Sequence, residues 1–159
     1  MRRKDREVTD QRTIRTILDR CKTCRVAMGD GEELYLVPLS YGYTLEDGTL
    51  TLWFHSAREG RKLDLLRRDP RVCFEISREG EPLFSENPCN SNYRFSSLIG
   101  WGEVTFVDDP AEACRGLALL YTHQTGRQAE FTPRQAEKIC IYKIVSTTYT
   151  AKQLEPEEF

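Results

Sequence analysis

The order in which extended and helical patterns follow one another is the feature that most constrains how this chain folds. Extended segments follow one another mainly through short turns, with only a few helices between them. The regular alternation of strand and helix that builds a doubly wound parallel sheet is absent. The predicted strands cover residues 25–28, 34–44, 50–55, 71–77, 93–107 and 139–146.

The helical patterns are few and sit between these strands. The first has apolar residues at i, i+3, i+4 and i+7 from Ile14, with Thr9 or Asp10 as the N-cap. Asp47-Gly48 is typical of a hairpin turn because it supplies the positive φ that such turns need. We therefore predict one mainly β (α+β) domain over residues 1–159, an antiparallel barrel of six strands with peripheral helices. The other predicted helices cover 59–68, 110–122 and 132–137, and Asp108 or Asp109 is the predicted N-cap of the helix at 110–122. Long loops are predicted at 79–92 and 123–131, and a polar tail covers 155–159.

Charge and hydropathy exclude several classes of protein. The formal net charge of −2 gives no general attraction to nucleic acid. No apolar run reaches the roughly 18–20 residues of a membrane span. The first six residues are charged without an apolar stretch behind them, unlike a signal peptide. We expect a cytoplasmic protein that binds neither nucleic acid nor membrane.

Six cysteines are present, and free thiols are the default for a cytosolic protein of this size. Cys21 and Cys24 form the close pair, but no second C-x-x-C or H-x-x-x-H completes a zinc site. A redox C-x-x-C would open a helix after a strand, whereas this one follows a helical pattern. We predict two small buried thiols and no metal.

One segment carries the pattern of an anion site. A predicted strand ends at Ser56 and Ala57, Gly60 follows, and Arg61 and Lys62 fall in the first turn of a helix. Free amides and the positive end of the helix dipole favour a phosphate there, and two cations at that end are unfavourable unless an anion is bound. The alternative from spacing alone is a solvated, charged helix face.

The same segment resembles the signature of flavoproteins related to pyridoxamine 5′-phosphate oxidase. The similarity is closest to the 5-nitroimidazole-resistance branch and spans roughly residues 7–152. Two flanking segments, 37–41 and 95–102, also resemble that branch, although Ser40 replaces a frequent asparagine and Leu98 a usual valine. The central resemblance lies in the run His55-Ser56-Ala57, Gly60-Arg61-Lys62-Leu63 and Asp69-Pro70-Arg71-Val72-Cys73-Phe74.

The resemblance implies a six-stranded split β-barrel that forms a homodimer and holds flavin mononucleotide (FMN) between the subunits, with FAD or haem as alternative cofactors. Arg61 and Lys62, with Gly60 at the turn, would hold the flavin phosphate, assisted by Ser97. The residues that would line the isoalloxazine ring or run along its edge are Pro38, Leu39, Ser40, His55, Ser56 and Ala57.

His55 is the candidate catalytic residue because a histidine at a strand end beside a flavin could donate a proton to a reduced substrate. The alternative is a structural histidine that hydrogen-bonds the backbone, and His123 is expected to be a cap or surface residue. Four aromatic residues could form the apolar walls of a flavin site or belong to the barrel core: Trp53, Phe54, Phe95 and Trp101.

Three functions follow as hypotheses. The first is an FMN-dependent oxidoreductase that takes electrons from a nicotinamide nucleotide, NAD(P)H, and reduces a small aromatic acceptor of nitroimidazole or quinone type. No G-x-G-x-x-G is present, which indicates that there is no dedicated dinucleotide-binding domain. The nucleotide would therefore bind transiently against the open face of the flavin. The second is a flavin-binding module without turnover. The third is a haem-binding split barrel with His55 or His123 as ligand.

Overall fold

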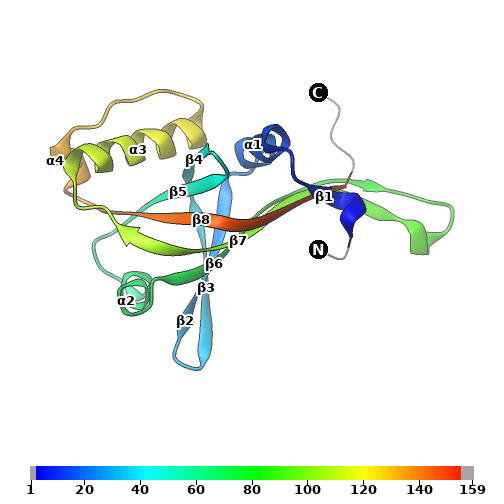
Figure 1. Cartoon of the computed structure of the whole chain (residues 1–159), viewed down its shortest axis with the longest axis horizontal. Helices are drawn as coiled ribbons and strands as arrows, with labels where there is room; N and C mark the ends of the chain where they lie inside the picture. The colour runs from blue at the N-terminus through cyan, green and yellow to red at the C-terminus, as the bar shows by residue number, and fades with distance from the viewer. Residues whose placement is uncertain (1–2, 155–159) are drawn as a thin grey trace.

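The computed structural model describes residues 3–154, so the predicted polar tail at 155–159 lies outside the described residues. A long antiparallel sheet forms the body of the molecule, and three of the helices gather near one end of it (Figure 1). The strands are β1 (Glu7–Val8), β2 (Thr23–Asp30), β3 (Glu33–Ser40), β4 (Gly42–Glu46), β5 (Thr49–Ser56), β6 (Arg71–Leu83), β7 (Asn92–Phe106) and β8 (Cys140–Leu154). The helices are η1 (Lys4–Arg6), α1 (Gln11–Arg20), α2 (Arg61–Arg68), η2 (Pro88–Asn90), α3 (Pro110–Thr125) and α4 (Pro133–Ala136).

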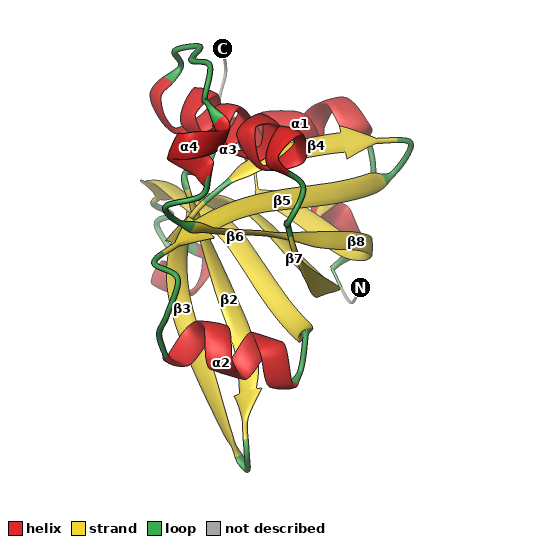
Figure 2. Cartoon of the chain, turned by 90° about the vertical axis from the view of Figure 1, so that its left-hand side faces the viewer, coloured by secondary structure: helices red, strands yellow, loops and turns green. Residues whose placement is uncertain are grey.

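The sheet confirms the predicted fold class. Its strands run in the order β3-β2-β6-β7-β8-β5-β4, with β1 paired to the end of β8, and every pairing is antiparallel. The two outer strands of this path, β3 and β4, are not paired with each other, so the curved sheet stays open as in a split barrel. Helix α2 lies across β2 and β3, and α3 lies over β4 and β5 at the other edge of the sheet (Figure 2).

The strand count differs from the six predicted, mainly because residues 34–44 form two strands. The chain breaks at Tyr41, which is fully buried and places its hydroxyl 2.9 and 3.0 Å from the carbonyl oxygens of Leu18 and Cys21. Gly42 then passes so close to α3 that a Cβ would lie 2.4 Å from the amide nitrogen of Leu120. This crossing sends β3 to one edge of the sheet and β4 to the other.

Two further boundaries were wrong, because strand pairing over long distances extends the ladder. β6 continues into the predicted loop 79–92 as far as Leu83, with a register shift between Glu79 and Pro82. β8 ends at Leu154 rather than residue 146, because beyond Ser146 it leaves β5 and remains paired with β7. The β6–β7 pair thus projects from the body as an arm (Figure 1).

Local signals placed the helix caps and the hairpin correctly. Asp10 caps α1 by accepting from the amide of Thr13 at 2.8 Å, and Asp109 caps α3 in the same way. Asp47 and Gly48 both have positive φ in the two-residue turn between β4 and β5. α3 runs to Thr125, three residues further than predicted, and ends at Gly126 in the left-handed conformation.

The core lies between the inner face of the sheet and the helices α1 and α2. Cys21 and Cys24 belong to it with 1% and 0% exposure, which confirms two buried thiols. Within residues 3–154 no group of three or more potential ligands could hold a metal ion. Over the same range, none of the helices combines the length and the apolar character that crossing a bilayer requires.

Candidate functional site

The link from β5 to α2 contains the turn that the sequence predicts to bind an anion. His55 and Ser56 end β5, and the Ser56 hydroxyl donates to the carbonyl of Ala57 at 2.8 Å. Gly60 is the N-cap of α2 with φ 134°, so no side chain caps this helix. In the described part of the chain, the amides of Arg61 and Lys62 have no hydrogen-bond partner. The helix therefore begins with free donors next to two cations.

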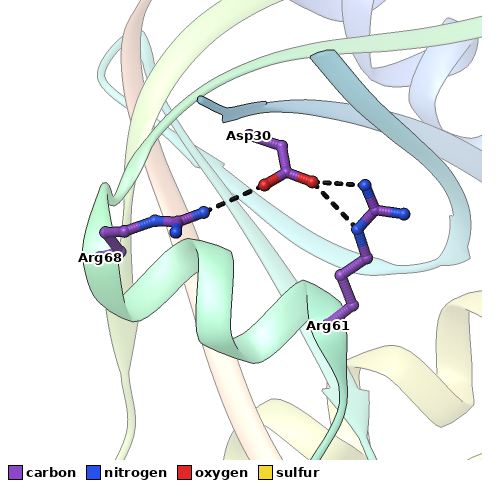
Figure 3. A network of polar contacts seen from close by, with 3 residues as sticks. All are labelled: Asp30, Arg61 and Arg68. Carbon is purple, nitrogen blue, oxygen red and sulfur yellow. Dashed lines mark hydrogen bonds and ion pairs between the residues drawn. The ribbon is translucent and has the colours of Figure 1, made fainter. Parts of the chain in front are cut away.

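Arg61 turns away from this opening toward the β2–β3 hairpin. Its guanidinium pairs with Asp30 at the end of β2, with Nε 3.0 Å from the carboxylate, and lies 4.7 Å from the ring centroid of Tyr35. Arg68 reaches the same carboxylate at 3.1 Å, so two arginines of α2 share one acid (Figure 3). The hydrogen bond from Arg61 is the main cause that lowers the pKa of Asp30.

Lys62 points in the other direction, toward the strand ends. Its Nζ lies 5.7 Å from the ring centroid of the buried Tyr142, and partial burial lowers its pKa. Across residues 3–154 no carboxylate lies within ion-pair distance of it. Its charge acts on His55, whose pKa is lowered first by desolvation and then by Lys62. Lys62 is thus a half-buried cation that no carboxylate of residues 3–154 balances.

The remaining predicted residues lie elsewhere on the sheet. Pro38 and Ser40 on β3 and Ser97 on β7 face outward, whereas Leu39 faces the core. Strand register places Ser40 and Ser97 in one row across β3, β2, β6 and β7, which separates them by roughly 14 Å at about 4.8 Å per strand. Lys62 packs on the inner side, so one protomer keeps these groups on opposite faces of the sheet.

The outer face of the sheet also carries large apolar side chains. Leu36 and Trp101 lie in one cross-strand row through Ala27 and Cys73, and they are 58% and 51% exposed. Leu34 and Ile99 extend this apolar outer face, with 81% and 41% exposure. Exposed apolar area of this kind is typical of an interaction surface. Trp53 and Phe54, by contrast, are buried. They belong to the core, which was the alternative to a role as walls of a flavin site.

Sequence reasoning missed Asp30, Tyr142 and Cys140 as neighbours of the turn. Burial raises the pKa of the Cys140 thiol, and the charges of Arg67, Arg58 and Lys62 oppose that rise. The register pairs Cys140 with Ser56, which brings the start of β8 beside the end of β5. Only this pairing of strands about 85 residues apart reveals the neighbourhood, since no local motif encodes it.

The structure is thus an open antiparallel split barrel in which a cationic, uncapped helix start follows a strand end. The sequence matches the model of the pyridoxamine 5′-phosphate oxidase family over residues 10–153, and the chain belongs to this family. The resemblance stated from the motifs is therefore confirmed at the level of the family. No curated protein matches the sequence significantly.

Solved structures with the same fold include flavin-binding and haem-binding proteins. A candidate 5-nitroimidazole antibiotic resistance protein from Bacteroides thetaiotaomicron is 27% identical, with a TM-score of 0.78 over 92% of this chain and 86% of that one. The FAD and haem binding protein from Mycobacterium smegmatis is 14% identical, with a TM-score of 0.78 over 97% and 77%. An FAD-binding protein from Mesorhizobium loti is 17% identical, with a TM-score of 0.65 over 94% and 98%.

Proposed function

We propose that this chain is a homodimeric FMN-dependent oxidoreductase that passes electrons from a nicotinamide nucleotide to a small aromatic acceptor. The observation that carries the proposal is Lys62, a half-buried cation without a carboxylate partner in the described chain, at the uncapped start of α2. A terminal phosphate would supply the missing negative charge and accept from the free amides. The donor set therefore suits the phosphate end of FMN.

Arg61 contributes differently from Lys62 in this proposal. Its pairing with Asp30 and stacking on Tyr35 hold the first turn of α2 against the β2–β3 hairpin. Arginine has five N–H donors, so the guanidinium can keep this pairing and still offer a donor toward a phosphate. Lys62 would balance the negative charge of the phosphate, and Arg61 fixes the position of the turn.

The dimer is proposed from two features of the outer face. Pro38, Ser40 and Ser97 cannot meet Lys62 in one protomer because they lie on the opposite face of the sheet. The apolar outer face around Leu36 and Trp101 is the surface that a second copy would cover. A flavin between two copies could contact the inner turn of one protomer and the outer face of the other.

Bound flavin would supply a carrier that accepts two electrons from one substrate and gives them to another. The protein would supply binding and protons. His55 lies at the end of β5, where desolvation and then the charge of Lys62 lower the pKa of its ring in the flavin-free protein. We propose that it exchanges a proton with the acceptor, while Ser56 and Ala57 present backbone groups along the flavin edge. The acceptor class follows from the similarity to the nitroimidazole resistance protein of Bacteroides, since a nitroimidazole is a small aromatic compound.

The test is the visible spectrum of the purified protein together with mass spectrometry of the extracted cofactor. We expect FMN, and we expect Lys62→Glu to lose most of it while the far-UV circular dichroism is unchanged. Lys4→Glu, in the exposed η1, is the matched control and should retain flavin. Unchanged flavin retention in Lys62→Glu would refute the phosphate assignment. Oxidation of NADH or NADPH with a nitroaromatic acceptor then separates the oxidoreductase from a flavin-binding module without turnover.

Haem binding is the second candidate, favoured by the shared fold of the Mycobacterium smegmatis protein that binds FAD and haem. Here the structure restricts the possible ligand. The Nδ1 of His123 lies 2.6 Å from the carbonyl oxygen of Tyr41, and its Nε2 lies 2.9 Å from that of Leu18. Both ring nitrogens are thus occupied, which leaves His55. A Soret band that is lost in His55→Ala would support haem over flavin.

A further inference from the structure

A cavity lined by two arginines adjoins the strand end that carries His55 and Ser56. It has a volume of about 280 Å³, and none of the ten residues predicted to bind flavin lines it. The register pairs Ser56 with Cys140 and His55 with Ile141, so the cavity adjoins the proposed flavin edge through β8. Its lining residues are Arg58, Arg67, Phe106, Val107, Asp108, Ile139, Cys140 and Ile141.

Two arginines from different segments converge on this cavity. Arg58, in the β5–α2 link, donates to the carbonyl of Glu137 at the end of α4. Arg67, on α2, lies 5.4 Å from the ring centroid of Phe106 and pairs with Asp64 only at 3.7 Å. These contacts orient both side chains and use few of their five N–H donors each. Both guanidinium groups are therefore oriented by their neighbours and keep further N–H groups that can donate to a ligand.

The charge around the cavity is positive. Arg58 and Arg67 face one carboxylate on its wall, that of the exposed Asp108. Lys62 adds to this field, since its charge, like those of the two arginines, acts on the Cys140 thiol. Phosphate groups are the ligands that paired arginines recognise best, through parallel N–H···O bonds. A cavity of this size accommodates a phosphate or pyrophosphate group but not a whole dinucleotide.

We propose that Arg58 and Arg67 form a second phosphate subsite, separate from the flavin phosphate at Lys62. The inference rests on the proposed function, in which a nicotinamide nucleotide must reach the flavin without a dedicated binding domain. The pyrophosphate of that nucleotide could bind the two arginines. A phosphate group on the acceptor has the same chemistry and could bind them in the same way. Either ligand would be anchored one strand away from His55.

The test measures inorganic pyrophosphate binding by calorimetry on the flavin-saturated protein, so that the Lys62 site is filled. We expect the double variant Arg58→Ala/Arg67→Ala to bind pyrophosphate at least about tenfold more weakly, with flavin content unchanged. Arg127→Ala/Arg134→Ala, at two exposed arginines outside the cavity lining, is the control and should bind like the wild type. Equal affinity in the wild type and the first double variant would overturn the proposal.

Two readouts separate this inference from the proposed function. If flavin content falls together with pyrophosphate binding in Arg58→Ala/Arg67→Ala, the cavity holds the flavin's own phosphate and the second subsite is refuted. The second readout is the KM of Arg58→Ala/Arg67→Ala for two electron donors. If its KM for NADH rises while its KM for dihydronicotinamide riboside, which lacks phosphate, equals that of the wild type, the nucleotide is the ligand. Loss of pyrophosphate binding with an unchanged KM for NADH identifies a phosphate on the acceptor.

Discussion

Arg61 and Asp30 form an ion pair that joins the first turn of α2 to the end of β2, with Nε 3.0 Å from the carboxylate. The two residues are 31 positions apart and come from segments with no common motif. Arg68 binds the other oxygen of the same carboxylate, so Asp30 fixes both ends of α2 (Figure 3). The neighbouring Lys62 is left to face the strand ends without such a partner in residues 3–154.

The Asp30 network should stabilise the fold in a pH-dependent way. The folded-state pKa of Asp30 is lowered, mainly by its hydrogen bond with Arg61. A carboxyl of this kind stabilises the fold above its unfolded-state pKa near 4, and the contribution is lost as the pH falls through the folded-state pKa. We expect Asp30→Asn to lower the free energy of unfolding at pH 7, and the difference from wild type to shrink toward pH 3.

Urea unfolding curves at both pH values check this prediction. Asp64→Asn is the control, because Asp64 pairs with Arg67 only at 3.7 Å on an exposed helix surface and should change little. A deficit in Asp30→Asn that is as large at pH 3 as at pH 7 would contradict the assignment to this carboxylate.

The pKa of His55 should change when an anion binds beside Lys62. In the absence of ligand, desolvation and the charge of Lys62 lower its pKa below the ordinary value near 6.5. A phosphate beside Lys62 would cancel that charge and stabilise the imidazolium, so flavin binding should raise the pKa of His55. Imidazole NMR titrations with and without FMN measure the change. Lys62→Met should raise the pKa in the flavin-free protein, and an unaltered value in both experiments would argue against the proposed proximity.

Two glycines offer a matched test of the crossing between β3 and β4. A Cβ on Gly42 would lie 2.4 Å from the backbone of Leu120, so Gly42→Ala requires α3 to shift. We expect a loss of about 1–3 kcal/mol in the free energy of unfolding, the usual range for overpacking. Gly29→Ala meets nothing within 4 Å and has no positive φ, so it should be neutral or slightly stabilising. Thermal unfolding of the two variants should therefore differ clearly, and equal melting temperatures would contradict this packing.

The apolar outer face should control the oligomeric state. Trp101 is 51% exposed in one chain, so Trp101→Lys is compatible with folding but places a charge where a second copy is proposed to pack. We expect a dimer for the wild type and a monomer with reduced flavin content for the variant, measured by light scattering after size-exclusion chromatography. Gln128→Lys, on the exposed loop after α3, should remain dimeric. A dimeric Trp101→Lys would place the interface elsewhere.

Features that depend on neighbouring residues could be predicted from the sequence. The caps at Asp10 and Asp109 and the turn at Asp47-Gly48 are local, because each is a bond or backbone angle within a few positions. The turn before Lys62 was predicted for the same reason, and the family followed from its motif. The break at Tyr41 was missed because a buried hydroxyl contact with residues about 20 positions away imposes it.

The amino-acid sequence by itself determined the order of the main elements, the N-caps of α1 and α3 and the cationic turn, since short-range hydrogen bonds and backbone preferences specify them. Only the tertiary structure decided that Arg61 and Lys62 point in different directions and that Ser97 lies on the opposite face from Lys62. It also assembled the cavity of Arg58 and Arg67 around Cys140. The physical reason is strand register: pairing across long stretches of chain sets which side chains share a face, and no local pattern contains that information.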